Sequence, residues 1–143
     1  MLDYSHMKDT NCLFCKIVAG EIPCEKIYED ADTLAFLDIM PVNPGHTLII
    51  PKEHYMNVFE APADVWAKVM DTVKKVAHGI QAGIPSPDLN IAMNNGKLAG
   101  QVVFHAHVHV MPRHEGDGYE LWHGKKYAEG EAPHIADKIK NAL

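Results

Sequence analysis

The sequence predicts an α+β domain in which helices lie against an antiparallel sheet of about five strands. Short apolar and β-branched runs alternate with turn-forming residues, which is typical of strands joined by tight connections. One longer segment, residues 62–81, carries apolar side chains at helical spacing and predicts a long amphipathic helix. A length of 143 residues suits one core, so we expect residues 1–143 to form a single domain.

The individual elements follow from local signals along the chain. Asn11 is a candidate cap for a first short helix over Cys12–Ala19, and Gly20 ends that helix. A second short helix is expected near His134–Leu143. Residues 1–10 are set aside as a flexible segment that is partly foreign to the native chain, and residues 114–143 as a C-terminal tail. Strands of an antiparallel meander are expected at Lys26–Tyr28, Thr33–Ile39, Thr47–Ile50, Leu89–Met93 and Val102–Met111.

Composition excludes several classes of partner. The formal net charge is −6 and no basic stripe is present, so the chain is not expected to bind a nucleic-acid polymer. No apolar run reaches the length of about 18 residues that a membrane span needs. No apolar leader opens the chain, and its three cysteines cannot all pair with one another, which favours a reducing cytoplasm.

Histidines occupy alternate positions, His105, His107 and His109, in the apolar run Val102–Met111 that Pro112 follows. Because the side chains of a strand alternate between its two faces, all three imidazoles should lie on one face. Three unpaired polar rings are costly to bury, so we expect the array to serve chemistry. The chain has 10 histidines, however, so chance can also produce this spacing, and the neighbouring residues must decide.

A metal site is the first alternative for this array. At about 3.3 Å per residue, the first and last positions lie about 13 Å apart, too far for three positions of a straight strand to share one ion. One or two of these histidines could still bind a metal together with ligands from elsewhere. A linear row suits a central nucleophilic or basic histidine, His107, while His105 and His109 orient it and donate hydrogen bonds.

Upstream of the histidines, residues 94–101 form a glycine-containing turn with amide side chains. Gly100 permits a positive φ or a close backbone approach, and Asn94 and Gln101 add hydrogen-bond donors. A turn that leads into a strand in this way can direct main-chain amides toward an anion. An ordinary hairpin turn is the alternative, and it is compatible with a phosphate site next to the histidines.

The segment Ala99–Arg113 resembles the signature of the histidine-triad (HIT) nucleotide-binding proteins. Ala35–Ile39 followed by Pro44–Lys52 is similar to the first half of the same family. Cys12–Ile17 with Gly20–Pro23 resembles the opening of its zinc-carrying bacterial members. The resemblance covers most of the chain in matching order, and it implies a HIT-like fold with one long helix and one or two short ones.

The resemblance also implies a nucleotide-binding hydrolase that cleaves purine nucleoside 5′-phosphoramidates through a nucleotidyl intermediate on His107. Without the resemblance, Asp38 is better interpreted as a carboxylate that caps a turn at the end of a strand. For the apolar residues near it, a place in the core is nearly as good an interpretation as a place at the base. The small nucleotide would contact His109, Asn94, Gly100, Gln101 and Val102 at its phosphate, Asp38 at its ribose, and Phe14, Ile17, Phe36 and Ile39 at its base.

Cys12 and Cys15 have the C-x-x-C spacing of a metal site. From the residues alone, a redox pair or two cysteines on one helix face remain open. The resemblance implies that these cysteines bind a structural zinc together with His54 and His105. The ion would tether the first helix to the catalytic strand, with no open position for water.

Val102 departs from the family pattern, because relatives often have Ser or Thr after the Gly-Gln pair. A lost hydroxyl bond to a charged group is worth about 1.5–3 kcal/mol, which corresponds to about one to two decades in rate. Three other functions therefore stay open. They are a dinucleoside polyphosphate hydrolase or other nucleotidyl transferase, a nucleotide-binding protein with weak catalysis, and a zinc metallohydrolase with the triad as its ligands.

An open five-stranded sheet leaves edge strands, and exposed edges invite pairing with another chain. Relatives pair by a two-fold axis that continues the sheet, so the resemblance implies a homodimer. The resemblance to the HIT family also places His46, which follows Pro44 and Gly45, near the nucleotide site. Cys24 and His114 are expected to be bystanders.

Overall fold

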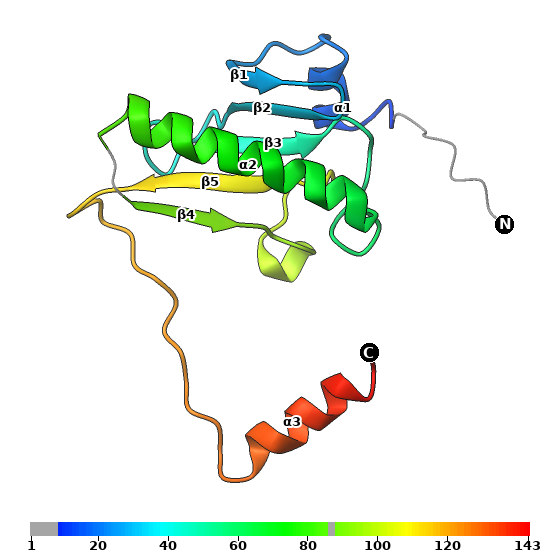
Figure 1. The fold of residues 1–143 in the computed structure, drawn as a ribbon, viewed down its shortest axis with the longest axis vertical. Coiled ribbons are helices and arrows are strands. Elements are labelled where there is room, and N and C mark those ends of the chain that lie inside the picture. Colours follow the sequence, from blue (N-terminus) through cyan, green and yellow to red (C-terminus); the bar gives the residue numbers. More distant parts are fainter. Residues whose placement is uncertain (1–8, 86–87) are drawn as a thin grey trace, which may run out of the picture.

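The computed structural model describes residues 9–85 and 88–143, and most of the segment 1–10 therefore lies outside the described residues. Five strands form one open antiparallel sheet, and a long helix lies across one of its faces (Figure 1). This arrangement confirms the α+β class. The elements are α1 (Leu13–Val18), β1 (Lys26–Glu29), β2 (Thr33–Leu37), β3 (Thr47–Pro51), α2 (Ala63–Gly83), β4 (Asp88–Ala92), the 3₁₀ turn η1 (Lys97–Ala99), β5 (Val108–Arg113) and α3 (Glu131–Lys140).

The strand order is β1-β2-β3-β5-β4, so the sheet is a meander only as far as β3. The helix α2 then carries the chain across the sheet, and β4 becomes an edge strand. The strand β5 returns between β3 and β4 and pairs with both of them. Residues just before and within β5 are thereby held at the middle of the molecule.

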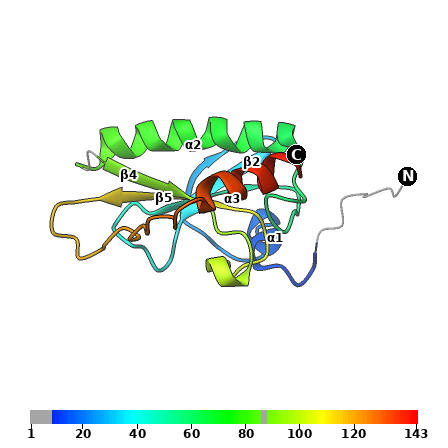
Figure 2. The same cartoon turned by 90° about the horizontal axis from the view of Figure 1, so that it is seen from below.

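The helices α2 and α1 lie on opposite faces of the sheet (Figure 2), and each face has its own apolar cluster. Paired residues of antiparallel strands share a face, and His109 pairs with Leu48, which belongs to the α1 cluster. The histidine row therefore lies on the α1 face. The α2 cluster contains Ala35, Ile49, Val108 and Val110 with Val69, Val73, Val76 and Ile80; the α1 cluster contains Leu34, Phe36, Leu48 and Ile50 with Cys12, Phe14 and Cys15.

The predicted strand Val102–Met111 is wrong at both ends, because β5 spans Val108–Arg113. Its partner β3 ends at Pro51, and the last pairing joins Ile49 to Val108. The residues before Val108 do not pair with β3, and their backbone is held by other bonds. The Ala106 N–H donates to Tyr55 O at 2.6 Å, for example. At the other end, Pro112 pairs with Leu89, and the strand passes through it.

The predicted cap of the first helix is also wrong. Cys12 and not Asn11 is the cap residue, and the Cys12 sulfur accepts the Cys15 N–H at 3.4 Å. The tail helix begins at Glu131, earlier than expected. No helix among the described residues is long and apolar enough to cross a membrane.

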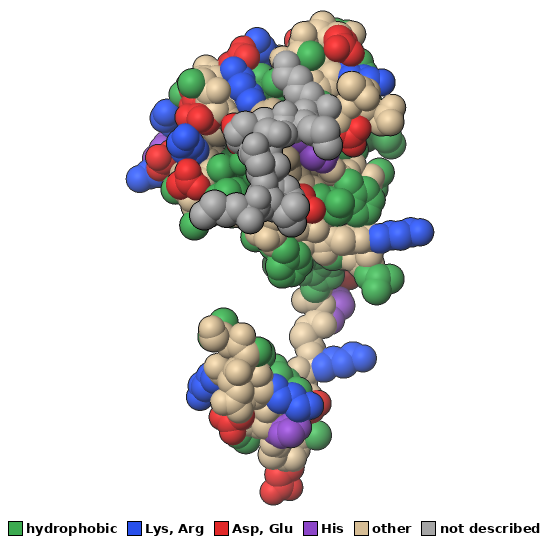
Figure 3. Space-filling model, turned by 90° about the vertical axis from the view of Figure 1, so that its right-hand side faces the viewer, with side chains coloured by type: hydrophobic (Ala, Val, Ile, Leu, Met, Phe, Trp, Pro, Cys, Tyr) green, Lys and Arg blue, Asp and Glu red, His purple; other side chains and the backbone are tan. Residues whose placement is uncertain are grey.

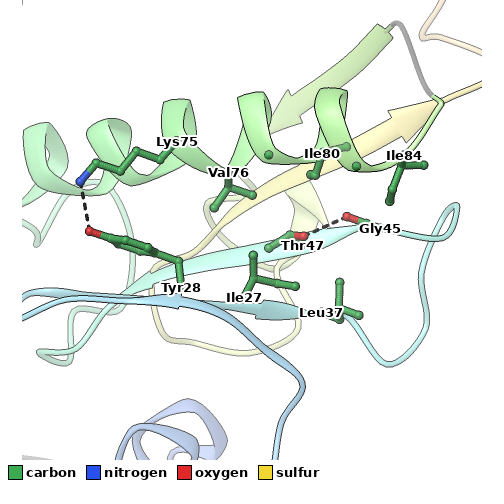
Figure 4. A pocket seen from close by; sticks show the side chains of 11 residues that line it. Ile27, Tyr28, Leu37, Gly45, Thr47, Lys75, Val76, Ile80 and Ile84 are labelled. Carbon is green, nitrogen blue, oxygen red and sulfur yellow. Dashed lines mark hydrogen bonds between the residues drawn. The ribbon is translucent and has the colours of Figure 1, made fainter.

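A cavity of about 380 Å³ lies between α2 and strands β1–β3, on the face opposite the histidines (Figure 4). Its wall is mainly apolar, and Tyr28 and Lys75 meet at its rim, where the Lys75 ammonium donates to the Tyr28 hydroxyl at 3.1 Å. Gly45 and Gly79 are two of the three glycines that line it, and their surroundings differ. Gly45 has φ +97° and faces Ile84, whereas Gly79 is part of α2.

Substituting these two glycines should change stability in opposite directions. In Gly45→Ala the new Cβ would lie 2.4 Å from Ile84 Cδ1, and a positive φ is strained for alanine. We expect a loss of about 2–4 kcal/mol. A Cβ at Gly79 meets nothing within 4 Å, so Gly79→Ala should add about 0.5–1 kcal/mol through helix propensity. Urea unfolding of both variants measures this difference, and equal midpoints would contradict it.

Candidate active site

The three imidazoles form a row on the α1 face although only His109 lies within β5. The rings of His107 and His109 have centroids 4.9 Å apart. Phe14 contacts the other pair edge-on, at 5.9 Å from His105 and 5.2 Å from His107. His105 is fully buried and His107 is 6% exposed. These ring contacts show that the three imidazoles lie on one face, as expected. His105 and His107 nevertheless precede β5, so they are not placed there by a regular strand.

The hydrogen bond of His107 fixes which of its nitrogens is free. Its Nδ1 lies 2.6 Å from the main-chain oxygen of His105, and only a protonated Nδ1 can donate to that carbonyl. The Nε2 lone pair is therefore available in the neutral ring. Burial lowers the pKa of His107, and the bond to His105 opposes this only in part. His107 is thus neutral and unprotonated at Nε2 near neutral pH, as a nucleophile requires.

A fourth histidine, His46, orients His109. The Val42 N–H donates to His46 Nδ1 at 3.0 Å, so the His46 proton is on Nε2. His46 Nε2 then donates to His109 Nδ1 at 2.9 Å, and this leaves the proton of His109 on its Nε2. Burial, with the neighbouring imidazoles His107 and His46, lowers the pKa of His109 to about 4. His109 is therefore a neutral N–H donor beside the nucleophile.

Asp38 directly follows β2 and lies beside this row. One carboxylate oxygen accepts the Met40 N–H at 2.8 Å, and the other lies 3.7 Å from His46 Nε2. Its negative charge acts to raise the pKa of both His107 and His109, against the larger effect of burial. The structure therefore brings Asp38 to the histidines, where sequence reasoning expected it. The neighbouring Ile39 is 94% exposed.

The turn before the histidines is shaped by Gln101. Its side-chain oxygen accepts the Gly96 N–H at 2.8 Å, and its amide nitrogen donates to Met56 O at 2.7 Å and to Val103 O at 3.2 Å. Both donors of this side chain are thereby used within the protein. Gly100 adopts φ +89°, which favours glycine.

The remaining phosphate candidates lie around the same turn. The Asn94 amide nitrogen lies 3.4 Å from Gly100 O. The main-chain amides of Gly100 and Gln101 donate to Lys97 O and Gly96 O. Among the described residues, no acceptor is found for the Val102 N–H, and the Val102 side chain is 85% exposed. Of the predicted main-chain donors, Val102 is therefore the one that can serve a ligand without rearrangement.

The four residues expected to contact the nucleotide base differ in how far they are exposed to solvent. Phe14 and Phe36 are buried in the α1 cluster with their rings 5.5 Å apart, and Ile17 packs against that cluster. These three residues therefore belong to the core or pack against it, and the Phe14 ring also contacts His107 edge-on. Ile39 is exposed and belongs to neither cluster.

Four residues from three separate segments of the chain meet at the His105 end of the row. The ligand atoms of Cys12, Cys15, His54 and His105 all lie within 4.8 Å of one another. His105 Nδ1 lies 3.4 Å from the Cys12 sulfur and 3.6 Å from the Cys15 sulfur, and His54 Nδ1 lies 3.4 Å from the latter. Two sulfurs and two imidazole nitrogens are the donor set of a structural zinc site.

The protonation of His105 suits a metal ligand. Its Nε2 donates to Pro51 O at 2.8 Å, so the Nδ1 lone pair points toward the sulfurs. Burial and the neighbouring Cys12 raise the pKa of Cys15 to about 11. A bound cation would reverse this effect, because it stabilises the thiolate. Cys24 lies outside this group, as expected.

Comparison with known proteins agrees with this geometry. A model of the HIT domain matches residues 19–116. Protein hit of Bacillus subtilis is 44% identical over 137 residues, which are 93% of this chain and 94% of that protein. An adenosine 5′-monophosphoramidase of Schizosaccharomyces pombe is 45% identical over 72% of this chain and 74% of its own length. An adenylylsulfatase of Arabidopsis thaliana is 46% identical over 75% of this chain and 54% of its own length.

Solved structures show the same fold. A HIT family protein from Bacillus anthracis is 40% identical, with a TM-score of 0.86 over 94% of this chain and 98% of that chain. A zinc-bound histidine triad family protein from Mycobacterium smegmatis is 35% identical, with a TM-score of 0.74 over 93% and 98% of the two chains. The sequence match, the fold and the histidine row agree, and this chain belongs to the HIT family.

Proposed function

We propose that this protein hydrolyses purine nucleoside 5′-phosphoramidates through a nucleotidyl intermediate on His107. The observation that carries the proposal is the bond from His107 Nδ1 to His105 O, which leaves Nε2 free for attack on phosphorus. The similarity to an adenosine 5′-monophosphoramidase supports this choice of substrate.

The reaction proceeds in two displacements at the α-phosphorus. First, the Nε2 lone pair of His107 forms a bond to phosphorus, and the P–N bond of the substrate breaks with its electron pair on the departing nitrogen. The amine takes a proton from solvent. Water then attacks the same phosphorus, the bond to Nε2 breaks, and the nucleoside monophosphate leaves while the water's proton passes to solvent. Phosphoryl transfer needs mainly positioning and charge stabilisation.

The groups around His107 supply that stabilisation. The Nε2–H of His109 faces the reacting phosphoryl group, and the Val102 amide is a second donor. Gln101 acts indirectly in this proposal, because its side chain holds the turn that presents the Val102 amide. Asp38 accepts hydrogen bonds from the ribose hydroxyls. Phe14, Ile17, Phe36 and Ile39 bound the base, and Ile39 is the most exposed of them.

The site of Cys12, Cys15, His54 and His105 holds a structural zinc in this proposal. The ion would join α1 to the segment before β5, and so fix the carbonyl of His105 that orients His107. The zinc-bound relative from Mycobacterium smegmatis supports this assignment. No step of the reaction needs an open metal position.

The proposal includes a homodimer in a reducing, cytoplasmic compartment. The edge strand β4 has one side without a partner strand in the sheet order, and a second copy could continue the sheet there. Free Cys12 and Cys15 are expected where thiols stay reduced.

A substrate panel tests the proposed reaction. We expect kcat/KM for an adenosine or guanosine phosphoramidate to exceed that for a dinucleoside polyphosphate by about tenfold or more, since each 1.4 kcal/mol is tenfold. Adenylyl sulfate belongs in the panel because a relative is named for it. A preference for the dinucleoside compound would assign that hydrolase instead. Tight nucleotide binding without turnover would instead indicate a nucleotide-binding protein with weak catalysis. The absence of a hydroxyl at Val102 favours that alternative.

A further inference from the structure

The carboxylate of Asp117 lies just beyond β5 and collects hydrogen bonds from several groups. Arg113, the last residue of β5, donates from Nε to one carboxylate oxygen at 2.6 Å and from Nη2 to the other at 2.9 Å. The main-chain N–H groups of His114 and Tyr119 donate to the same carboxylate at 3.3 and 3.1 Å. Arg113 above all lowers the pKa of Asp117, so this side chain stays charged near neutral pH. A fixed negative charge is therefore held at the end of β5.

The packing of the C-terminal tail does not account for this arrangement. Residues 118–134 are all exposed, and α3 has no buried residue. Figure 3 shows the tail as a separate mass joined to the body by a narrow neck. The Asp117 side chain itself is only 5% exposed. Its carboxylate is therefore directed into the body of the protein, where it meets the side chain of Asn43.

Asn43 lies in the loop between β2 and β3. Its amide nitrogen uses both of its hydrogens, one in a bond to Pro112 O at 2.8 Å and the other in a bond to the Asp117 carboxylate at 3.0 Å. Pro112 belongs to β5, the strand that also carries His109. Among the described residues, no other side chain of residues 39–45 bonds to β5 or to Asp117. Asn43 therefore fastens this loop to the strand of the active site.

The loop fastened in this way determines where His46 carries its proton. The main-chain N–H of Val42 donates to His46 Nδ1 at 3.0 Å, and Asn43 O accepts the His46 N–H at 3.0 Å. An N–H directed at Nδ1 excludes a proton on that nitrogen, so His46 is protonated at Nε2 and donates to His109 Nδ1. His109 then keeps its own proton on Nε2. One main-chain N–H thus decides the tautomers of both imidazoles.

This control is effective because the two tautomers of a neutral imidazole differ little in free energy. A hydrogen bond contributes about 0.5–1.5 kcal/mol, and a buried group left facing another donor costs about 1–3 kcal/mol. These amounts are enough to select one tautomer as long as the Val42 N–H stays in place. Once the loop is able to move this N–H away from His46, the selection is lost.

We propose that Asn43 and Asp117 are positioning residues that hold His46 and His109 in the tautomers needed for the reaction. Without the Asn43 amide, the loop withdraws the Val42 N–H. His46 then takes a proton from solvent at Nδ1 and passes its Nε2 proton to His109 Nδ1, while His109 releases its own Nε2 proton to solvent. The net charge is unchanged, but His109 now directs a lone pair instead of an N–H at the phosphoryl group.

Nitrogen-15 NMR of the histidine rings measures these tautomers directly, because a ring nitrogen with a proton and one with a lone pair resonate at well-separated shifts. Burial lowers the pKa of both His46 and His109, so both rings are neutral at pH 7. In the parent protein we expect each ring to carry its proton on Nε2. In Asn43→Ala we expect comparable amounts of the two tautomers in both rings. Spectra of His46→Gln and His109→Asn assign the signals.

The rate of the reaction gives a second readout of the same variant. Only molecules with a proton on His109 Nε2 react well, so kcat of Asn43→Ala should fall about threefold to tenfold. KM should stay within about twofold, because Asn43 contacts no part of the nucleotide in the proposed function. Asn43→Leu keeps most of the side-chain volume and removes both donors, so it should reproduce the tautomers and the rate of Asn43→Ala.

Asn90→Ala is the matched control. Asn90 lies in β4 and accepts a bond from Arg113 Nη1 at 2.7 Å, so this substitution also removes a side-chain amide that contacts the Arg113–Asp117 pair. It leaves the bonds of Asn43 intact. We expect the tautomers of the parent and a kcat within about twofold of it. Asp117→Ala should resemble Asn43→Ala, and the double variant should be no worse than the more affected single one, because both residues act through one contact.

The outcomes separate this inference from the proposed function. It rests on that function only for the use of the His109 N–H, whereas the tautomers are measured without substrate. Parent-like tautomers in Asn43→Ala, or equal changes in Asn43→Ala and Asn90→Ala, would overturn the inference and leave the proposed reaction untouched. Altered tautomers with an unchanged kcat would overturn the role in the reaction. A lack of turnover in the substrate panel, with a parent protein that holds both Nε2 protons, would overturn the proposed function alone.

Discussion

Replacing the central histidine, His107→Asn, should lower kcat by about four decades or more while nucleotide binding stays within a few-fold of the parent. The substitution removes the attacking Nε2 and keeps an amide that can donate to His105 O. Ribose and base contacts do not involve His107 in this proposal. Rapid mixing of the parent enzyme with substrate, followed by a denaturing quench, should trap an acid-labile nucleotidyl adduct on His107.

Variants of the neighbouring histidines order the roles within the row. His109→Asn should still form the adduct, but more slowly, because it removes an N–H donor and not the attacking atom. His105→Asn should fail mainly through loss of the metal site and of stability. The exposed helix residue His78 provides the control, and His78→Asn should match the parent in rate and stability. Substantial turnover by His107→Asn, or an adduct on His105 or His109, would refute the assignment.

Removing a ligand of the proposed zinc, Cys15→Ser, should lower the unfolding temperature by about 10 °C or more, as loss of a few kcal/mol of metal binding would. Activity per folded molecule should fall much less, because a closed four-ligand site takes no part in the bond changes. Elemental analysis of the parent protein should give about one zinc per chain. Differential scanning calorimetry with and without a chelator measures the same contribution.

The control for this variant is the third cysteine. Cys24→Ser replaces a partly exposed thiol outside the cluster, and it should leave both zinc content and unfolding temperature nearly unchanged. A parent protein prepared without chelators that contains no zinc, with Cys12 and Cys15 reduced, would contradict the structural-zinc proposal. Direct loss of activity on chelation, without unfolding, would instead favour a zinc metallohydrolase.

Local patterns in the sequence predict a large part of this fold. Short apolar and β-branched runs between turn residues give β1 to β4 to within two residues at each end, and the helical period of Val69, Val73, Val76 and Ile80 gives α2. These patterns are informative because a face that packs against a core must be apolar at the repeat of its own element. The sequence also indicates the row of His105, His107 and His109, because residues at alternate positions of a predicted strand lie on one face.

Other features depend on contacts that no local pattern encodes. The strand β5 begins at Val108 because its pairing with β3 ends there, at Ile49, and the backbone before it bonds elsewhere, as the Ala106 N–H does to Tyr55 O. Gln101 was expected to bind phosphate, yet its side chain is occupied by Gly96, Met56 and Val103. His46 was placed near the site only by resemblance, and no local signal predicts its bond to His109. The motif Pro44-Gly45-His46 indicates that His46 lies near the site, but it does not indicate which side chain His46 contacts.

The sequence by itself determined the class of fold, the residues available for chemistry and the C-x-x-C half of the metal site, because these depend on residue type and spacing. The tertiary structure decided how those residues act. His46 and His109 are 63 positions apart, and Cys12 and His105 are 93 apart, so their contacts exist only after the sheet has formed. Those contacts set which nitrogen of each imidazole carries the proton. A ring has two nearly equivalent nitrogens, and the hydrogen-bond partner that the fold places beside one of them leaves the other free to attack, donate or bind a metal.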